Sequence, residues 1–259
     1  MTKGFDGERY SRSSRPQKEI GRSVIDSIKW RGDERVVDLG CGDGKLTAEI
    51  ASRLSSGSVL GLDSSASMIE AARKHRAENL SFQVMDVTHL SFVEEFDLAF
   101  SNAALHWVLD QRTMLGNLRQ GLKHRGRLRV NFAGDGNCPN LLEGMRRKMA
   151  DERFRERFRG FRWPWYMPSA QEYARVLEEA GFEQIEVWSE RADRLFSSEK
   201  EYRPFIENMA IVPLLDQFED LGERDAFRQA VLTEIMDLSR APGGFYEPFL
   251  RINASAVRP

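Results

Sequence analysis

The sequence predicts an α/β fold, an open and mainly parallel β-sheet with helices on both faces. Between residues 35 and 134, short apolar runs alternate with segments whose apolar residues recur at helical spacing, as a parallel sheet with helical crossovers requires. Several apolar runs end in glycine or a polar residue, and ligands bind at the carboxyl ends of strands in such sheets. With 259 residues, of which 41% are hydrophobic, the chain can bury a sizeable core.

The elements expected up to residue 134 follow from these patterns in chain order. A helix over Pro16–Trp30 comes first, with its apolar residues on one stripe. The expected strands are Arg35–Gly40, Ser58–Asp63, Leu80–Asp86, Phe96–Asn102 and Arg127–Ala133. The expected helices between them are Lys45–Leu54, Ser67–His75 and Thr113–Leu122.

The regular alternation stops after residue 134. Residues 139–163 indicate an irregular helical stretch, interrupted at Gly144 and Gly160. Ser169 and Glu172 form a capping-box pattern for a helix that reaches Ala180. A strand near Ile185–Arg191, helices over 199–210 and 223–239, and a last strand over Phe249–Val257 complete the expectation. We therefore expect one domain over 1–259, made of a core at 15–135, a helical cap at 136–168 and a second helical insertion at 199–245.

Charge and composition argue against several classes of protein. Forty acidic residues against thirty-eight basic ones give a formal net charge of -2, without the surplus of a non-specific nucleic-acid binder. No apolar run approaches the ~20 residues that cross a bilayer, and the N-terminal residues lack an apolar signal core. We expect a soluble, cytoplasmic protein that is a monomer or a homodimer. Cys41 and Cys138 form neither a disulfide framework nor a metal-ligand pattern, so no metal is expected.

A glycine-rich loop follows the first expected strand in the sequence D-L-G-C-G-D-G-K. Its glycines at 40, 42 and 44 stand where the strand must turn tightly into a helix, and glycine lets a backbone approach a ligand closely. The dinucleotide-binding pattern fails at Lys45, and the P-loop pattern fails at Leu39 and Leu46. The loop therefore differs from both of these diphosphate-binding motifs.

Two acids follow the loop on successive strands. Asp63 ends the second strand, nineteen residues after Gly44, where a carboxylate can accept both hydroxyls of a ribose. Asp86 ends the third strand and is placed to meet an adenine amino group. Ordinary turn residues are the alternative, since Asp and Gly are common in turns. The glycines and both acids in this order favour a nucleoside ligand without a diphosphate.

These motifs resemble those of class I S-adenosylmethionine-dependent methyltransferases. D-L-G-C-G-D-G is similar to the family's first motif, G-L-D-S-S to its ribose acid and V-M-D-V to its adenine contact, and the likeness covers about 15–135. The resemblance implies a Rossmann-like seven-stranded mixed sheet of order 3-2-1-4-5-7-6 with strand 7 antiparallel. It implies S-adenosyl-L-methionine as cofactor and S-adenosyl-L-homocysteine as product. The cofactor-binding residues it implies are Asp38, Gly40, Cys41, Gly42, Asp63, Ser64, Met68, Asp86, Val87, Ser101 and Asn102.

The acceptor side is similar to that of trans-aconitate and juvenile hormone acid methyltransferases. The similar residues are S-N-A-A-L-H-W at 101–107 and Y-S-R-S-S-R-P-Q at 10–17. Both groups esterify small carboxylates, so the resemblance implies an organic acid as acceptor. A carboxylate is ionised at neutral pH and needs no general base, which leaves alignment and exclusion of water to the enzyme. His106, Trp107 and Gln17 are the candidate catalytic residues.

Other interpretations stay open on the same residues. His106 is either a hydrogen-bonding group, a general base for a hydroxyl or phenol, or a structural histidine. The acceptor atom is open as well, since carbon, nitrogen and phenolic oxygen are all methylated on this fold. From a different class, a cofactor-binding regulator or a nucleic-acid-associated protein remains an alternative. The motifs of base-modifying enzymes are absent, because S-N-A-A stands at 101–104 and Cys138 precedes Pro139.

A basic and aromatic segment follows the fifth expected strand. Between Arg146 and Trp163, eight Arg or Lys stand against three acids, interleaved with phenylalanines. A solvated basic face on an amphipathic cover helix is the favoured interpretation. An arginine turned inward to hold a distal anionic group comes second, and a nucleic-acid groove last. The residues expected to contact substrate are Tyr10, Trp163, Trp165 and Tyr166.

Overall fold

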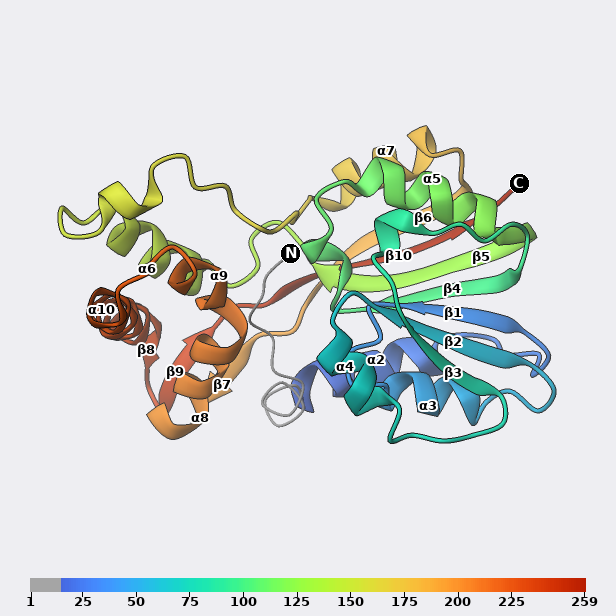
Figure 1. Ribbon diagram of the computed structural model, residues 1–259, viewed down its shortest axis with the longest axis horizontal. Helices are drawn as coiled ribbons and strands as arrows, with labels where there is room; N and C mark the ends of the chain where they lie inside the picture. Colours follow the sequence, from blue (N-terminus) through green and yellow to red (C-terminus); the bar gives the residue numbers. More distant parts are fainter. Residues whose placement is uncertain (1–14) are drawn as a thin grey trace. The chain divides into compact units, whose positions relative to one another are not determined.

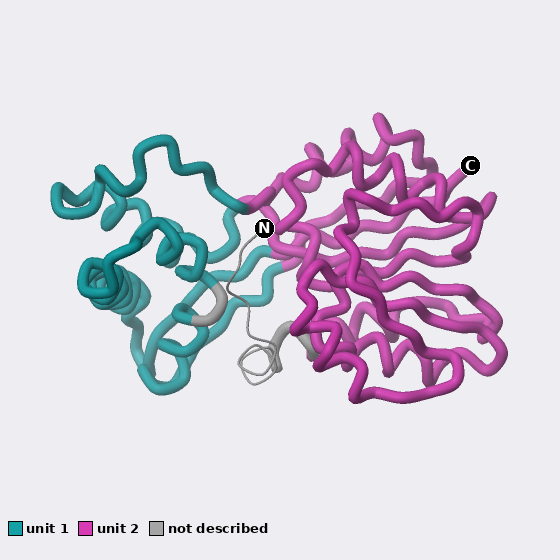
Figure 2. The backbone as a smooth tube through the Cα atoms, viewed as in Figure 1, with its two compact units in different colours: residues 1–5, 136–164, 191–250 teal, residues 6–135, 165–190, 251–259 magenta. Residues whose placement is uncertain are grey.

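The chain forms two compact units in the computed structural model, which describes residues 15–259 and the side chains of 19–207 and 210–259 (Figure 2). Of the described residues, 15–135, 165–190 and 251–259 make up one unit, here called the sheet unit. Residues 136–164 and 191–250 make up the other, here called the small unit. The small unit thus combines segments from two places in the sequence. The arrangement as one domain with two insertions stays a prediction.

The sheet unit is built on a seven-stranded sheet of order β3-β2-β1-β4-β5-β10-β6. Its strands are β1 (Arg35–Leu39), β2 (Ser58–Asp63), β3 (Leu80–Val84), β4 (Phe96–Asn102), β5 (Leu122–Ala133), β6 (Glu183–Arg191) and β10 (Leu250–Val257). Strands β1 to β5 pair in parallel, and β10 runs antiparallel to β5. The predicted order and its antiparallel late strand are confirmed.

Helices cover both faces of this sheet (Figure 1). On one face lie α2 (Arg15–Asp26), α3 (Lys45–Ala51) and α4 (Ala66–Ala72), and on the other lie α5 (Gln111–Gly121) and α7 (Ala170–Glu179). Successive strand residues point to opposite faces, so Val36 packs with α2 and α3 while Val37 packs with α5 and α7. Burial on both faces is typical of parallel sheets and explains their apolar runs.

Helix boundaries follow local capping more closely than apolar spacing. Ser169 and Glu172 form the predicted capping box at the start of α7. Helix α2, in contrast, ends at Asp26 and not at Trp30. Residues 27 and 28 continue it as a turn, in which the N–H of Ile28 donates to the Ile25 carbonyl at 3.2 Å, and the Glu34 carboxylate then accepts the backbone N–H groups of residues 31 and 32 at 2.8 and 2.9 Å. Apolar spacing carries no signal for such a turn.

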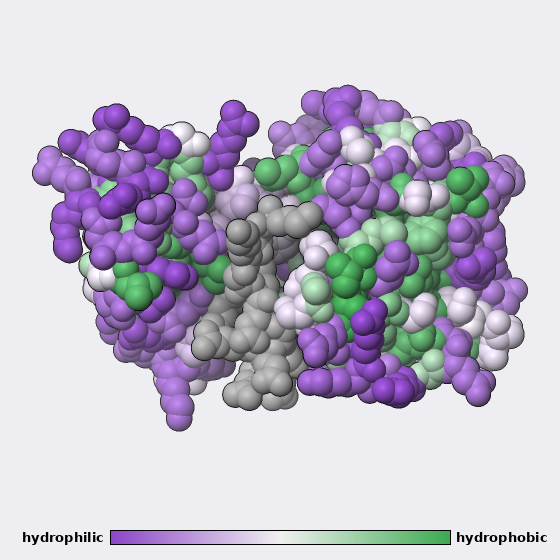
Figure 3. Space-filling view, in the orientation of Figure 1, coloured by the Kyte–Doolittle hydropathy of each residue, from purple (hydrophilic) through white to green (hydrophobic). Residues whose placement is uncertain are grey.

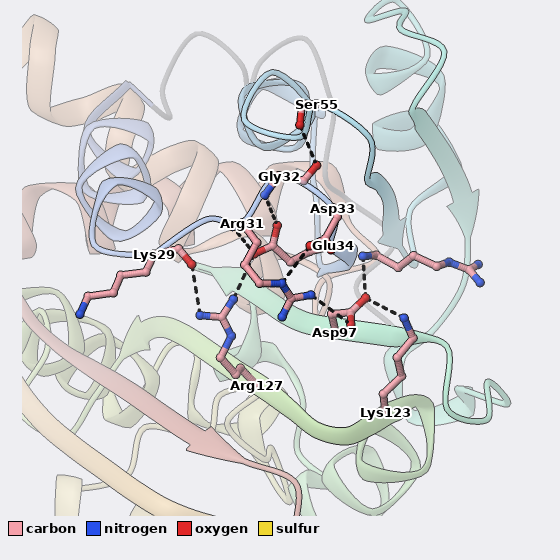
Figure 4. Close-up of polar contacts among 10 residues, drawn as sticks. Lys29, Arg31, Gly32, Asp33, Glu34, Ser55, Asp97, Lys123 and Arg127 are labelled. Atoms are coloured by element: carbon pink, nitrogen blue, oxygen red, sulfur yellow. Dashed lines mark hydrogen bonds and ion pairs between the residues drawn. The ribbon is translucent and has the colours of Figure 1, made fainter.

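Charged residues join the strands at the amino edge of the sheet, opposite the carboxyl ends (Figure 4). Glu34 is fully buried, and Arg127 on β5 donates to its carboxylate at 3.3 Å. Asp97 on β4 accepts from the backbone of Arg35 at 2.9 Å and from Lys123 at 2.8 Å. These contacts connect β1, β4 and β5 at the end away from the glycine loop.

The small unit contains helices and a second, three-stranded antiparallel sheet of order β7-β9-β8. Its elements are α6 (Pro139–Ala150), η3 (Arg155–Phe158), β7 (Arg194–Phe196), α8 (Glu199–Phe205), η4 (Ile206–Ala210), α9 (Val212–Leu215), α10 (Leu221–Ser239), β8 (Arg240–Ala241) and β9 (Gly244–Glu247). The sequence predicted only helices here, because strands of two to four residues are too short to show alternation. The predicted interruption at Gly144 was wrong: α6 continues through it, since glycine lets the helix pass close to Ile235.

The basic segment has the predicted solvated face, but it is not a continuous helix. Helix α6 ends at Ala150, where the Asp151 carboxylate accepts the backbone N–H of Arg153 at 3.0 Å and forms a turn. Phe154 and Phe158 are buried against the Phe227 ring, with centroids 5.1 Å apart in each case. Seven arginines are exposed, namely Arg146, Arg147, Arg153, Arg155, Arg157, Arg159 and Arg162.

Hydrophilic side chains dominate the small-unit surface in the view of Figure 3. Ion pairs join Arg147 to Glu234 at 3.0 Å and Arg157 to Glu223 at 2.5 Å. These acids on α10 neutralise part of the local positive charge. In the described part of the chain, no helix is long and apolar enough to cross a membrane.

A buried carboxylate connects four elements of the small unit. Glu247 on β9 is fully buried and accepts from the hydroxyls of Tyr202 on α8 and Ser239 on α10 at 2.7 and 3.2 Å. It also accepts the backbone N–H of Asn140 at the start of α6, at 3.1 Å. Burial raises the pKa of Glu247 to about 7, although these hydrogen bonds oppose the rise.

Replacing Glu34 with alanine should lower the free energy of unfolding by about 2–4 kcal/mol, because it leaves a partly buried guanidinium and two backbone N–H groups without their acceptor. Chemical denaturation measures this change. Asp33→Ala is the control, since the Asp33 side chain is 61% exposed and surface ion pairs contribute ~0–1 kcal/mol. Equal losses in the two variants would contradict the assignment.

Glu247→Gln should remove a pH dependence of stability. The folded-state pKa of Glu247 is raised from 4.5 to about 7, so the folded chain holds a proton that the unfolded chain releases between these values. Stability therefore falls as pH rises through this window, by about 2–3 kcal/mol. The difference in unfolding free energy between the wild type and Glu247→Gln, measured from pH 5 to 7.5, isolates this contribution. Parallel pH profiles would refute it.

Candidate active site

The glycine loop between β1 and α3 lies at the carboxyl edge of the sheet. Gly40, Gly42 and Gly44 have φ angles of 73, 55 and 75°, a region that side chains with a Cβ rarely occupy. The backbone N–H groups of Gly40 and Cys41 donate to the Leu62 carbonyl at 2.8 and 2.9 Å. A Cβ at Gly40 would lie 2.2 Å from that of Ala104. The loop is therefore held to β2 and passes directly against the loop after β4.

Asp38, near the end of β1, is a buried acid that is hydrogen-bonded to the helix after this loop. Its side chain is 2% exposed and accepts the Thr47 hydroxyl of α3 at 2.7 Å. Burial raises the pKa of Asp38 to about 7; the charge of Asp63 acts in the same direction and the Thr47 bond against it. Asp38 thereby fixes the first turns of α3 relative to β1.

Asp63, at the end of β2, connects two backbone segments. Its Oδ2 accepts the N–H of Gly42 at 3.0 Å and its Oδ1 accepts that of Ser65 at 2.9 Å. Burial raises the pKa of Asp63, and both hydrogen bonds oppose the rise. A carboxylate offers about four lone-pair sites, so two N–H groups leave room for further donors. Next to it, Ser64 is exposed and Met68 is buried in α4.

Asp86 follows β3 and caps the short helix η1 (Val87–His89). Its Oδ1 accepts the backbone N–H and the hydroxyl of Thr88 at 2.9 and 2.7 Å. Burial would raise the pKa of Asp86, but the bonds from Thr88 outweigh it and lower the pKa. Asp86 is therefore ionised at neutral pH. Val87 is 8% exposed.

Two further predicted cofactor residues have side chains that face the protein interior. Ser101 on β4 is fully buried, and its hydroxyl donates to the Leu39 carbonyl of β1 at 2.7 Å. Cys41 is 9% exposed, and burial raises the pKa of its thiol well above the ordinary value. A thiol in this state is a poor nucleophile, in keeping with a packing role. Asn102 ends β4 on the α2 side, where a Cβ at Gly21 would lie 2.9 Å from its Nδ2.

An aromatic cluster lies beyond the end of β4, in the sheet unit. It consists of His106 and Trp107 on the short helix η2 (Leu105–Trp107) together with Trp165 and Tyr166. The Trp107 ring is 5.4 Å from that of His106 and 5.7 Å from that of Trp165. The backbone N–H of Tyr166 donates to the His106 carbonyl at 2.8 Å. Four residues predicted for the acceptor side are thus brought together.

The imidazole of His106 is neutral at physiological pH. Burial lowers its pKa to about 3, and the positive charge of Arg251 acts in the same direction. The residue keeps some exposed surface, but its Nδ1 is buried and finds no hydrogen-bond partner among the described residues. A base with such a pKa is too weak to take a proton from a hydroxyl near pH 7.

Three further residues were predicted for the acceptor side. Trp163 belongs to the small unit, where its ring lies 5.6 Å from that of Phe161 and 5.9 Å from the Arg146 guanidinium. Tyr10 lies outside the described residues. Gln17 lies in α2, but its side chain is outside the described part of the chain. Within the described residues, no three His, Cys, Asp or Glu side chains are grouped as a metal site would require.

Sequence reasoning missed a polar row across three neighbouring strands. Asn102, Asn131 and Asn253 occupy matching register positions on β4, β5 and β10, and the Asn131 amide donates to Asn253 Oδ1 at 3.0 Å. Arg251, at the start of β10, is 5% exposed and donates from Nε to Asn131 Oδ1 at 2.9 Å. The available signal was the alternation of Arg251, Asn253 and Ser255 with apolar residues.

Comparisons with known proteins agree with this geometry. A family model described as a methyltransferase domain matches residues 31–196, well over half of the chain. A trans-aconitate 2-methyltransferase of Deinococcus radiodurans is 38% identical over 126 residues, 49% of this chain and 48% of the relative. One of Rhodococcus jostii is 29% identical over 238 residues, 88% of this chain and 89% of the relative.

Among solved structures, a putative methyltransferase from Bacillus halodurans superposes with a TM-score of 0.62 at 16% identity, covering 93% of this chain and 99% of its own. At that identity the likeness concerns the fold. The described site suits an adenosyl cofactor, because a glycine loop with left-handed backbone follows β1 and ionisable acids stand at the end of β2 and just after β3. By its family model, relatives and fold, the chain belongs to the methyltransferase-domain family and is a class I S-adenosylmethionine-dependent methyltransferase.

Proposed function

We propose that this enzyme O-methylates a carboxylate of a small organic acid. The observation that carries the proposal is the uncharged aromatic cluster at the end of β4, in which burial keeps His106 neutral with a pKa of about 3. Two trans-aconitate 2-methyltransferases among the relatives act on an acid of this kind. The aromatic cluster contains no group that can remove a proton at neutral pH. It therefore suits an acceptor that is already ionised.

For the cofactor, the proposed contacts are backbone at the glycine loop and carboxylates at the ends of two strands. S-adenosyl-L-methionine supplies an electrophilic methyl group on a sulfonium. The loop brings the backbone of Gly40 and Gly42 to the ligand without side chains, while Asp63 receives ribose hydroxyls. In this proposal Asp86 and Val87 contact the adenine. Ser101 and Cys41 contribute by packing the loop from behind, because their side chains are buried.

In the proposed reaction, the residues of the aromatic cluster align the acceptor with the methyl group and exclude water from it. Trp107 and Trp165 meet edge to face and present apolar surface that excludes water, which strengthens electrostatic interactions in the site. A carboxylate with a pKa near 4 is ionised at pH 7, so no proton has to move during transfer. A phenol or an alcohol would need a base, and His106 cannot supply one at neutral pH.

Asp63→Asn should weaken binding of S-adenosyl-L-homocysteine about 10–100-fold, since an amide of the same size loses charge-assisted hydrogen bonds, which contribute ~1.5–3 kcal/mol each. Isothermal titration calorimetry measures the affinity. Asp33→Asn is the control, because Asp33 is exposed at the opposite edge of the sheet. Unchanged affinity in a folded Asp63→Asn protein would remove Asp63 from the site.

A matched acceptor panel tests the proposed reaction. Labelled S-adenosyl-L-methionine is incubated with trans-aconitate, succinate, octanoate and benzoate, and with phenol, benzyl alcohol and benzylamine as uncharged or amine counterparts. Methyl transfer is expected to acids alone, and the product should be a base-labile ester. Neither a carboxylate near pKa 4 nor His106 titrates between about pH 6 and 8, so any change of turnover in this range should follow Asp38, whose pKa is about 7, and should be the same for every acid of the panel. Transfer to phenol or amine without transfer to any acid would overturn the proposal.

A further inference from the structure

Helix α5 is anchored in the core of the sheet unit. Its residues Met114, Leu115 and Leu118 are buried in the same core as the apolar side chains of β1 and β5. Its start is fixed as well, because the Asp110 carboxylate accepts the backbone N–H of Thr113 at 3.0 Å. Side chains on this helix can therefore hold neighbouring turns in a defined position.

Gln111, the first residue of α5, binds the turn that carries His106 and Trp107. Its Nε2 donates to the Leu105 carbonyl at 2.8 Å and to the Val108 carbonyl at 2.7 Å. Leu105 is the first residue of η2, and Val108 directly follows its last. The amide thus uses both of its hydrogens, and the two bonds connect both ends of the turn to α5.

The amide of Gln111 is costly at a buried position. The residue is 4% exposed, and its Oε1 is buried and finds no hydrogen-bond partner among the described residues. A buried oxygen without a donor lowers stability, and an apolar side chain of similar size would avoid this cost. The two bonds to the turn are what an apolar side chain could not supply. An amide at position 111 therefore serves to hold the turn.

The turn held by Gln111 lies against the glycine loop. A Cβ at Gly40 would lie 2.2 Å from that of Ala104, the residue before η2. Ala103 has a φ angle of 58°, which is uncommon for a residue with a Cβ and persists where the surrounding structure holds it. Methyl transfer requires the reacting atoms to lie ~3–3.5 Å apart. The placement of η2 relative to the loop should therefore affect the rate of transfer.

Asn117, further along the same helix, binds a second turn. Its Nδ2 donates at 2.8 Å to the carbonyl of Thr88 in η1, the short helix that follows Asp86. The Asp86 carboxylate accepts the backbone N–H and the hydroxyl of the same Thr88. Thr88 is therefore held by Asp86 and by Asn117. Helix α5 thus binds both the turn proposed for the acceptor and the turn proposed for the adenine.

We propose that Gln111 and Asn117 are positioning residues of the methyl-transfer site, in which Gln111 places η2 for the acceptor and Asn117 places η1 for the adenine. The inference rests on the proposed roles of these two turns and adds the side chains that place them. Each residue acts through hydrogen bonds to backbone carbonyls and not through contact with a ligand. Substitution of one should therefore affect its own turn and spare the other.

Kinetics with a methylated acid of the panel, together with binding of S-adenosyl-L-homocysteine, test the role of Gln111. Gln111→Met keeps the length of the side chain but donates no hydrogen bond. It should lower kcat about 10–100-fold, because a small misplacement of reacting groups has a large effect on rate, and should leave the affinity for S-adenosyl-L-homocysteine nearly unchanged. Gln111→Asn keeps the amide on a shorter side chain that reaches at most one carbonyl, so its kcat should lie between those of Gln111→Met and the wild type.

Asn117→Leu should give the opposite pattern. Its affinity for S-adenosyl-L-homocysteine should fall about tenfold, since the adenine turn loses a hydrogen bond, while kcat at saturating cofactor stays close to that of the wild type. Gln120→Met is the matched control, because Gln120 is exposed on the same helix and the same chemical change there should alter neither measurement. Equal effects of Gln111→Met and Asn117→Leu on both measurements would show a general loosening of α5 and would overturn the inference.

Nuclear magnetic resonance of the His106 ring tests the placement of η2 without any acceptor. Burial lowers the pKa of His106 to about 3, so the ring should stay unprotonated between about pH 5 and 8 in the wild type, Gln120→Met and Asn117→Leu. In Gln111→Met the turn is released and the ring gains water, so its pKa should rise toward the ordinary value of 6.5.

Two results would contradict the role of Gln111. One is a folded Gln111→Met protein whose His106 stays unprotonated over the same pH range as in the wild type, and the other is a kcat equal to that of the wild type. If no panel acid is methylated but His106 titrates in Gln111→Met alone, the placement of η2 by Gln111 is supported and only the proposed acceptor is wrong.

Discussion

Burial of both faces of the seven-stranded sheet is the constraint on which the rest of the sheet unit depends. With α2 and α3 on one face and α5 and α7 on the other, most polar side chains of the inner strands are confined to the two edges. At the amino edge, Glu34 and Asp97 join neighbouring strands (Figure 4). At the carboxyl edge, Asp63 holds the glycine loop and the aromatic cluster follows β4, so the groups suited to chemistry gather there.

Two acids at the carboxyl edge hold the glycine loop and the helix after it in place through hydrogen bonds within the protein. Asp63 holds the N–H of Gly42, and Asp38 holds α3 through Thr47. Because these bonds fix the loop in its left-handed conformation, little ordering entropy remains to be lost on binding. Burial raises the pKa of both carboxyl groups, and the charge of Asp63 adds to the rise at Asp38.

Local signals explain what the sequence could predict. The sequence could point to the glycine loop, Asp63 and Asp86 as candidates because each stands at or just after the end of its own strand, and the capping box of α7 could be predicted because it lies within four consecutive residues. The strands β7 to β9 were missed because they are too short for a pattern. Trp163 and Trp165 stand two residues apart, yet they belong to different compact units. The distance between two residues in the sequence does not show that the boundary between two compact units falls between them.

Arg251 shows why part of the site depends on topology. Its contact with Asn131 spans 120 residues and exists only because β10 inserts antiparallel beside β5, which turns the start of β10 toward the carboxyl edge. In the sequence it is one arginine among many, whereas in the fold it is a cation whose field reaches a neutral histidine.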